Sequence, residues 1–496
     1  MGGDGEDDGS SGAPSLNRSV AVSSVATMAT NLAGIATGLV TFRFLTTRLG
    51  TSAYGQLATI TNLVSVFVIL TDIGVIALTT RELAQQPEAA ASILGRGLGF
   101  RLSLCAIGMP IVWITGFALY SQQASIIRLG VVILSLSLPL EGASALLMSH
   151  FRASIRGVTV ALWALTKGTI TAVVLIVVLV SGGGVLGCVL CYLGGAALST
   201  LLAVILVRRE VTFRPQFKGQ SWRRTGMASL AFGSIQIVNL LYLKFDILLL
   251  SVLSGSRVVG LYAVAYTLIG IVSNVPSAFM ATVFPVLSRV TEGEASELAE
   301  RASASLSALA GLAVAGVVVL GPALITLVSG PNYSGARIPL YLLSVTFLFT
   351  FPALAIGTTL VAINKMYGIL RISIFGLLLN AGLNLVLIPT HGAPGAASAT
   401  VVSELVVFVA SARNFQRITG RRIPILSQSA RPTLAAAACI GLSLLAPQVS
   451  APIIAVLVIK SLVITMVYVV LLWAMGGLPQ EAKAAVRSVT RRFARY

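Results

Sequence analysis

Hydrophobic residues fill most of the chain in about fourteen long runs, and a short polar gap separates each run from the next. Each run is largely apolar over roughly 18 residues or more, so as a helix it is long enough to cross about 30 Å of hydrocarbon. The pattern predicts an all-α polytopic membrane protein with about 14 transmembrane helices. The expected spans are 19–42, 54–77, 98–120, 124–148, 158–181, 184–207, 227–253, 260–287, 303–329, 338–363, 367–389, 394–412, 432–447 and 450–475.

Basic residues are unevenly distributed between the polar gaps. The even gaps, numbered from the N-terminus, hold nearly all the Lys and Arg, and Arg81, Arg96 and Arg101 belong to the second gap. Short loops rich in Lys and Arg stay in the cytoplasm. We therefore expect a multi-pass protein of the bacterial plasma (inner) membrane, with both termini cytoplasmic. The basic residues of the odd gaps are Arg43, Arg48, Arg128, Arg257 and Arg337.

The amino-acid composition excludes several classes of protein. With 496 residues, 56% hydrophobic and 10% charged, the chain does not have the make-up of a soluble protein. The net charge of +18 comes from residues that flank apolar runs, which favours membrane topology and contact with anionic membrane lipids over nucleic-acid binding. The four cysteines lie inside apolar runs, where metal or redox chemistry is not expected. We expect no metal site.

The extramembrane segments are too short for a nucleotide-binding domain, and the chain contains no GxxxxGK[ST] motif. ATP hydrolysis by this chain is therefore not expected, and neither is enzymatic activity.

Glycine spacing indicates an internal repeat. Gly50 and Gly55 match Gly255 and Gly260 at an offset of 205 positions, and Gly184 with Gly187 matches Gly392 with Gly395 at 208. An offset that spans six helices predicts two six-helix lobes related by a pseudo-two-fold axis along the membrane normal, followed by two C-terminal helices. The expected order is a disordered cytoplasmic tail (1–18), the N-lobe with helices 1–6 (19–207), a basic cytoplasmic linker (208–225), the C-lobe with helices 7–12 (226–412), a basic cytoplasmic loop (413–431), helices 13 and 14 (432–475) and a basic cytoplasmic tail (476–496).

Polar residues inside the apolar runs are candidates for substrate binding. A charge at the bilayer centre costs about 2.5–3.5 kcal/mol on insertion scales, so these side chains should face protein or water. Asn239, Tyr242 and Asp246 share one broad face of helix 7, whereas Lys244 points about 200° away from Asp246. Arg43, at the outer end of helix 1, has a guanidinium fork that suits a phosphate. The alternative for these residues is interhelical hydrogen bonding that only assembles the bundle.

Three carboxylates are coupling or gating candidates. Asp72 lies near the cytoplasmic end of helix 2, where it could instead be a structural partner for Arg81 or a helix cap. Glu141 and Glu404 each lie within a helix, and either is a possible protonatable coupling site. Coupling to H⁺ or Na⁺ stays open, and no resident cofactor is expected.

Several short segments together resemble the polysaccharide-flippase (O-antigen/exopolysaccharide-type) branch of the multidrug/oligosaccharidyl-lipid/polysaccharide exporter superfamily. The turn at 47–55 and the helix ending at 71–74 with 80–82 resemble that family's first helix pair. The most specific segments are 246–250, 259–263 and 284–289, followed by the helix 11 to 12 connection with Asn380, Asn384, Gly392 and Thr400. The resemblance covers roughly residues 20 to 415.

This resemblance implies a transporter that moves a polyprenyl-diphosphate-linked saccharide from the cytoplasmic to the outer leaflet. It implies a central cavity, alternating access, and a role in cell-envelope or extracellular polysaccharide biosynthesis. The implied partners are the lipid-linked saccharide and, as an open alternative, a glycan polymerase or glycosyltransferases. Two other functions stay open: a cation-coupled multidrug or metabolite exporter of the same fold, and a membrane scaffold for glycan synthesis.

Overall fold

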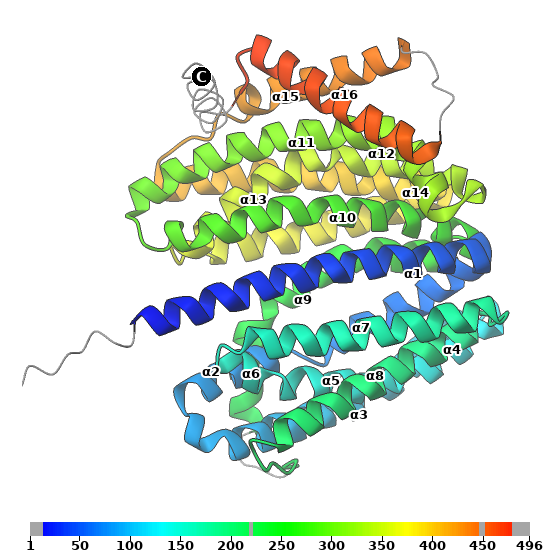
Figure 1. The fold of residues 1–496 in the computed structure, drawn as a ribbon, viewed down its shortest axis with the longest axis vertical. Coiled ribbons are helices and arrows are strands. Elements are labelled where there is room, and N and C mark those ends of the chain that lie inside the picture. Colours follow the sequence, from blue (N-terminus) through cyan, green and yellow to red (C-terminus); the bar gives the residue numbers. More distant parts are fainter. Residues whose placement is uncertain (1–12, 218–221, 446–451, 479–496) are drawn as a thin grey trace, which may run out of the picture. The chain divides into compact units, whose positions relative to one another are not determined.

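The computed structural model describes residues 13–217, 222–445 and 452–478, and the regular structure in these residues is entirely helical (Figure 1). The chain divides into two compact units. Unit 1 takes residues up to Leu49 together with Ile60–Leu240, and unit 2 takes Gly50–Thr59 together with Leu241–Tyr496. The division falls inside a helix, α9, and a ten-residue piece of the first helix belongs with the C-terminal unit.

Unit 1 is built around a core of aliphatic and aromatic side chains that includes Leu94, Leu146, Phe151 and Val207. Its elements are most of α1 (Ala13–Leu70), then α2 (Val75–Gln85), the short helix η1 (Pro87–Ala89), α3 (Ala90–Leu119), α4 (Ser125–Ser135), α5 (Ser137–Leu147), α6 (Ser149–Ala153), α7 (Gly157–Val180), α8 (Val185–Arg208) and the first part of α9 (Trp222–Leu253).

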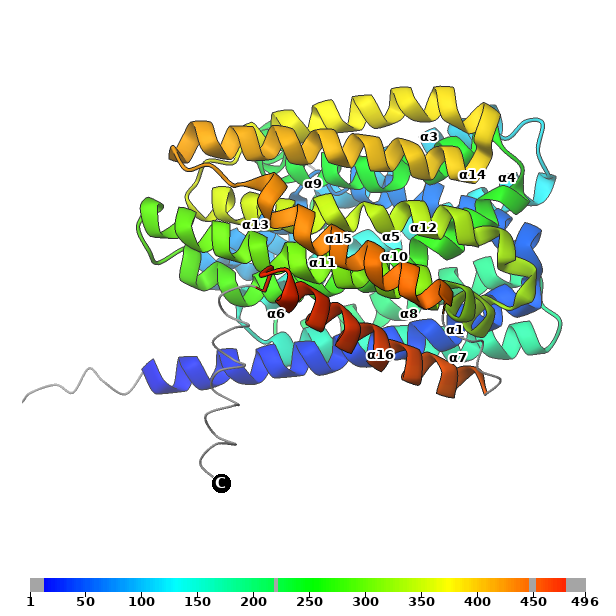
Figure 2. The ribbon, with the colours of Figure 1, turned by 90° about the horizontal axis from the view of Figure 1, so that it is seen from above.

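Unit 2 packs long helices side by side, and α13 lies against both α11 and α14 in the two ribbon views (Figure 2). Its elements are the 50–59 piece of α1, the rest of α9, α10 (Ser256–Leu287), α11 (Glu292–Ser329), the short helix η2 (Pro331–Ala336), α12 (Arg337–Val345), α13 (Phe347–Ala362), α14 (Tyr367–Thr419), α15 (Ile425–Leu445) and α16 (Ile453–Ala474).

The predicted set of membrane helices is confirmed. Ten helical segments in the described residues are long and apolar enough to cross a membrane. Two of them are pairs of predicted helices joined through a kink, at Gly50 (φ 76°) in α1 and at Gly392 (φ 56°) in α14. Together with α9 and α15, they account for the fourteen apolar runs. Both kinks need the left-handed backbone conformation that glycine adopts most readily.

Several predicted helix ends are wrong, and two of them have a clear local cause. The span 54–77 actually stops at Leu70, because the backbone turns through positive φ at Ile73 and Gly74. A Cβ at Gly74 would lie 2.3 Å from the carbonyl oxygen of Ser229, so this turn also allows a close approach to α9. The span 303–329 begins earlier, at Glu292, because Thr291 and Glu294 form a capping box.

The repeated glycines meet inside unit 2. A Cβ at Gly55 would lie 1.7 Å from the carbonyl oxygen of Ser256, and a Cβ at Gly260 would lie 2.1 Å from that of Thr51. Each of these contacts therefore mirrors the other across the 205-position offset. Only glycine lets the two backbones approach this closely.

The last two helices, α15 and α16, pack on α11. The Tyr468 hydroxyl of α16 donates to the carbonyl oxygen of Ala308 at 2.7 Å. A Cβ at Gly311 would meet both Tyr468 and the backbone of Pro432 in α15. These two helices thus cover a face of unit 2 without entering the set of helices that carries its polar interior.

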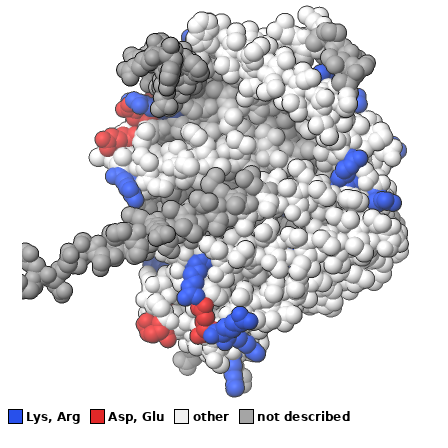
Figure 3. Space-filling view, in the orientation of Figure 1, with Lys and Arg blue, Asp and Glu red and all other residues white. Residues whose placement is uncertain are grey.

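Charged side chains are sparse along the helices. On the face drawn in Figure 3, Lys, Arg, Asp and Glu gather near helix ends, and most of the surface along the helices carries none of them. Among the described residues, large apolar side chains are exposed on the helices, including Ile114, Leu201, Leu378 and Leu462. A surface of this kind is suited to contact with lipid acyl chains.

Candidate functional site

The kink at Gly392 brings the two halves of α14 side by side, with polar residues facing each other. Asn380 and Asn384 lie one turn apart on the first half, and Thr400 and Ser403 lie one turn apart on the second. Tyr242 and Asp246 project from α9 with the same one-turn spacing. A single turn of the backbone therefore assembles a polar cluster inside unit 2.

The carboxylate of Asp246 is the centre of this cluster and is only 2% exposed. Its Oδ2 accepts hydrogen bonds from Thr400 Oγ1 at 2.6 Å and from the Tyr262 hydroxyl at 3.1 Å. Its Oδ1 accepts a hydrogen bond from Asn384 Nδ2 at 2.7 Å. All three donors are neutral, so these contacts solvate the carboxylate without cancelling its charge.

A second set of hydrogen bonds extends the cluster away from Asp246. Asn384 Nδ2 also donates to Asn380 Oδ1 at 2.9 Å, and Asn380 Nδ2 donates to Ser403 Oγ at 3.2 Å. The Tyr242 hydroxyl donates to the same Ser403 Oγ at 3.3 Å. The network is thus continuous from Asp246 to Tyr242.

One oxygen in the cluster has no hydrogen-bond donor. Asn384 Oδ1 is buried and unpartnered, although it lies on the residue that holds Asp246. A buried acceptor without a donor is costly, whereas a cation would satisfy it. The cluster thus contains carboxylate, amide and hydroxyl oxygens, the kinds of ligand that hard cations take in proteins.

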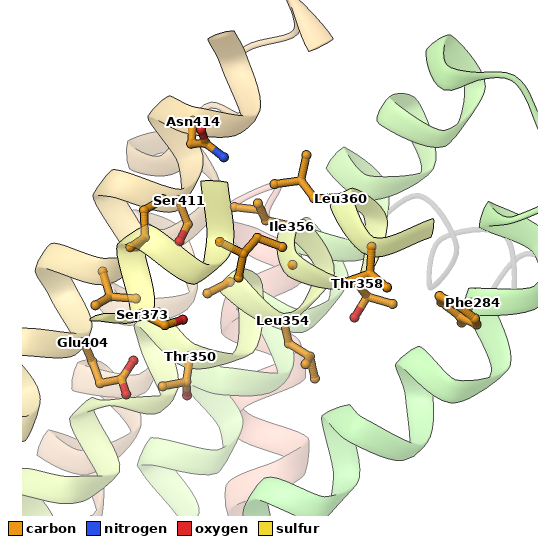
Figure 4. Close-up of a pocket in the computed structure, with 16 residues that line it drawn as sticks. Phe284, Thr350, Leu354, Ile356, Thr358, Leu360, Ser373, Glu404, Ser411 and Asn414 are labelled. Atoms are coloured by element: carbon orange, nitrogen blue, oxygen red, sulfur yellow. The ribbon is translucent and has the colours of Figure 1, made fainter. Parts of the chain in front are cut away.

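A cavity of about 440 Å³ lies next to this cluster, between α13, the two halves of α14 and the end of α10 (Figure 4). Glu404, Thr350 and Ser373 gather at one end of the cavity, and Asn414 lies at the other. The Glu404 carboxyl also interacts with the Tyr242 hydroxyl. The remaining lining is mostly apolar and includes Phe284, Leu354, Ile356, Leu360, Ile369 and Val407.

Unit 1 holds a partly buried carboxylate with a different environment. Asp72 Oδ1 lies 3.0 Å from Arg101 Nη1, and Arg101 is 1% exposed. Arg101 Nη2 also donates to the carbonyl oxygen of Val68 at 2.8 Å, and the Ile76 amide donates to Asp72 Oδ1 at 3.3 Å. The suggested pairing of Asp72 with Arg81 is therefore replaced by an ion pair with Arg101.

Arg101 itself was misassigned from the sequence, because it was counted with the basic residues of a cytoplasmic gap. It lies within α3, where a Cβ at Gly142 would stand 2.9 Å from its Nε. Because Gly142 has no side chain, it leaves room for the guanidinium of Arg101. The sequence signal for Arg101 is its position inside an apolar run, with glycine at the position that α5 presents to it.

The other predicted residues lie in separate places. Glu141 forms a salt bridge of 2.6 Å with Lys167, and both side chains are about one-third exposed or less, at 31% and 27%. Arg43 is exposed near the end of the first half of α1, in unit 1. Lys244 is partly buried on α9 and belongs to a different face of the helix from Asp246. The side chain of Asn239 lies outside the described residues.

The structure therefore joins Tyr242, Asp246 and Glu404 in one region and leaves Asp72, Glu141 and Arg43 in the other unit. It adds Asn380, Asn384, Thr400 and Ser403, which the sequence analysis did not select as site residues. Two asparagines one turn apart in an apolar helix are the signal that could have identified them.

Comparison with known proteins gives the following. The sequence profile of a family described as "Polysaccharide biosynthesis protein" matches residues 16–291, and no curated protein matches the chain. Among solved structures, a "Lipid II flippase MurJ" in an inward closed conformation is 13% identical with a TM-score of 0.68, and the match covers 91% of this chain and 97% of that chain.

Multidrug transporters share the same fold. An inward-facing multidrug resistance MATE family transporter of the MOP superfamily is 14% identical with a TM-score of 0.62, over 78% of this chain and 94% of that chain. An outward-facing one is 15% identical with a TM-score of 0.51, over 81% and 95%. At sequence identities this low, the structural likeness establishes the fold but does not identify what the chain transports.

Proposed function

This chain belongs to the polysaccharide biosynthesis protein family, and on that premise we propose that it is a flippase for a polyprenyl-diphosphate-linked saccharide. It moves this lipid from the cytoplasmic to the outer leaflet by alternating access, in cell-envelope or extracellular polysaccharide biosynthesis. The match over residues 16–291 carries the proposal, because it concerns this sequence rather than a distant fold. The fold that the chain shares with a lipid II flippase supports it.

Physical considerations agree with this direction of transport. The diphosphate headgroup is anionic, and a membrane potential that is negative inside drives each negative charge outward by about 2.3 kcal/mol per 100 mV. The protein has only to shield the headgroup and saccharide from hydrocarbon while the lipid tail stays in the bilayer. This work requires no covalent chemistry.

The coupling part of the proposal is that Asp246 binds a monovalent cation. A proton needs only the carboxylate, whereas Na⁺ also needs neutral oxygen ligands, and Thr400 Oγ1 and the side-chain oxygen of Asn384 are oxygens of this kind in the Asp246 cluster. The unpartnered Asn384 Oδ1 supports this choice. We therefore take Na⁺ as the coupling ion and H⁺ as the alternative.

Lipid analysis of cells depleted of this protein tests the cargo. Polyprenyl-diphosphate saccharides should accumulate, and an impermeant probe applied outside the cells should fail to label them. Re-expression of the wild-type chain should restore labelling, whereas Asp246→Asn should restore it only weakly at an equal protein level. An unchanged glycolipid profile after depletion would refute the flippase function.

The second candidate is a cation-coupled multidrug or metabolite exporter of the same fold. The likeness to an inward-facing multidrug transporter, with a TM-score of 0.62, is the observation that favours it. The same depletion strain separates the two functions. Lost resistance to small cationic compounds with an unchanged lipid profile would establish the exporter.

A further inference from the structure

The cavity beside Glu404 is lined by the same two halves of α14 that hold the buried carboxylate of Asp246. It extends toward the end of unit 2 that contains the turn from α13 to α14, where Ile369 and Leu360 line it. The basic residues near this end, among them Lys365 and Arg413, are those that predict the cytoplasmic side. Among the described residues, this cavity therefore offers a path into unit 2 from the cytoplasm.

Two polar rows lead inward from the cavity. On the first half of α14, Ser373 lines the cavity, and Asn380 and Asn384 follow on the same helix face at seven and eleven positions further on. Eleven residues of helix span about 16 Å, so this row extends from the cavity to the Asp246 carboxylate. On the second half, Ser411 and Glu404 line the cavity, and Thr400 lies one turn beyond Glu404.

The Tyr242 side chain contacts both the inner cluster and the residues that line the cavity. A Cβ built at Gly376 would lie 3.5 Å from Tyr242 Cε2 and 2.4 Å from Val407 Cγ2, so Gly376, Val407 and the Tyr242 ring are packed together. The Tyr242 hydroxyl contacts Ser403 on the inner side and Glu404 on the cavity side. Tyr242 is therefore placed where it can open or close the route.

From this arrangement, which rests on the proposed cation coupling, we propose that the cavity is the cytoplasmic access path of the Asp246 cation site. Glu404 is a transient ligand that attracts the cation and passes it inward, and Tyr242 is the gate. The ligand class is a desolvating monovalent cation, with Na⁺ as the first choice. The carboxylate of Glu404 supplies the attraction, while Thr350, Ser373 and Ser411 supply hydroxyl groups that can replace part of the hydration shell.

The test measures binding and exchange separately on the purified full-length protein in detergent. Radioactive Na⁺ is bound to equilibrium, and its release is then followed after dilution into unlabelled Na⁺. Glu404→Gln should bind Na⁺ with an affinity near that of the wild-type chain but exchange it about tenfold more slowly, since a charge in a narrow cleft accelerates ion association by tenfold or more. Tyr242→Ala should exchange faster than the wild-type chain, and Tyr242→Phe should keep the gate.

Two control variants distinguish a failure of the access path from a failure of the cation site itself. Glu88→Gln removes one negative charge from the exposed helix η1 and should leave exchange unchanged. Asp246→Asn should abolish binding. If Glu404→Gln exchanges Na⁺ as fast as the wild-type chain while Asp246→Asn does not bind it, the access path is refuted and the cation site stands. If the wild-type chain binds no Na⁺, the sodium site and the access path both fail, while the lipid analysis still decides the cargo.

Discussion

Each unit holds an aspartate that is mostly shielded from solvent, 2% exposed for Asp246 and 14% exposed for the side chain of Asp72, and the two carboxylates are stabilised in opposite ways. In unit 1, Asp72 is held by a buried guanidinium, with Arg101 Nη1 at 3.0 Å, so the pair is neutral as a whole. In unit 2, Asp246 is held by the hydroxyls of Thr400 and Tyr262 and by the amide of Asn384, which are all neutral donors and supply no counter-charge.

This difference favours a structural role for Asp72 and supports the coupling role that we propose for Asp246. A carboxylate with a fixed cation gains little from a second, mobile one, whereas a buried carboxylate with neutral donors attracts any cation that can reach it. The comparison predicts that changes at the Asp72 pair act on folding and that changes at Asp246 act on cation dependence.

The largest effect is expected from breaking the pair in unit 1. Arg101→Met leaves the partly buried carboxylate of Asp72 without its ion-pair partner. This should cost about 3 kcal/mol of stability, the lower end for a buried pair because the Asp72 side chain is 14% exposed, and should lower the yield of folded protein. Thermal unfolding of the purified protein measures it. The double variant Arg101→Met/Asp72→Asn removes both charges and should recover part of the loss. Equal instability of the single and double variants would show that lost packing, rather than the stranded charge, is responsible.

A smaller effect with a different signature is expected at Asp246. At Na⁺ concentrations about 100-fold above the dissociation constant, the wild-type protein should gain about 2.7 kcal/mol of stability relative to choline at the same ionic strength. Asp246→Asn keeps the shape of the side chain but should lose this gain. Thermal shift in NaCl and in choline chloride measures both proteins. An equal Na⁺-dependent shift in the variant would remove Asp246 from the site.

The neutral donors should contribute less than the carboxylate. Thr400→Val removes one hydroxyl from the Asp246 site and should weaken Na⁺ binding about tenfold, which corresponds to about 1.4 kcal/mol. Thr400→Ser keeps the hydroxyl and serves as the matched control. Titration of the thermal shift with Na⁺ gives both affinities. If serine is as damaging as valine, the methyl group matters more than the oxygen.

The smallest effect is expected at the partly exposed pair in unit 1. Glu141 and Lys167 lie 2.6 Å apart, but their exposure of 31% and 27% allows solvent to screen the charges. Lys167→Met should therefore change stability by less than about 1 kcal/mol in the same unfolding assay. A loss as large as that of Arg101→Met would mean that burial is not what distinguishes the two pairs.

The sequence predicted the features that depend on local pattern. Apolar runs gave the helices, and Gly50 and Gly392 marked the places where paired helices meet, because a chain can turn there only through a left-handed conformation. Asp246 was selected because a charged side chain within a membrane helix is energetically costly and is therefore usually retained for a function.

Features that depend on packing between distant segments were not predictable in the same way. The partner of Asp72 was expected nearby in sequence, at Arg81, whereas Arg101 reaches it from α3. The donors around Asp246 come from α10 and from the two halves of α14, which meet only when α14 folds back on itself. The cavity at Glu404 depends on the same fold, so the pattern along a single helix could not indicate it.

The close contact between the repeated glycines in unit 2 bears on the origin of the internal repeat. Gly55 meets Ser256 while Gly260 meets Thr51, and these are the same two positions of the repeat taken in both directions. A reciprocal contact of this kind is the hallmark of an interface between identical subunits. We infer that an ancestor of half this length used one glycine on both sides of a homodimer, and that duplication and fusion would have turned that one position into two. Each of the two positions has to be glycine, because a Cβ at either one would meet the backbone of the other helix.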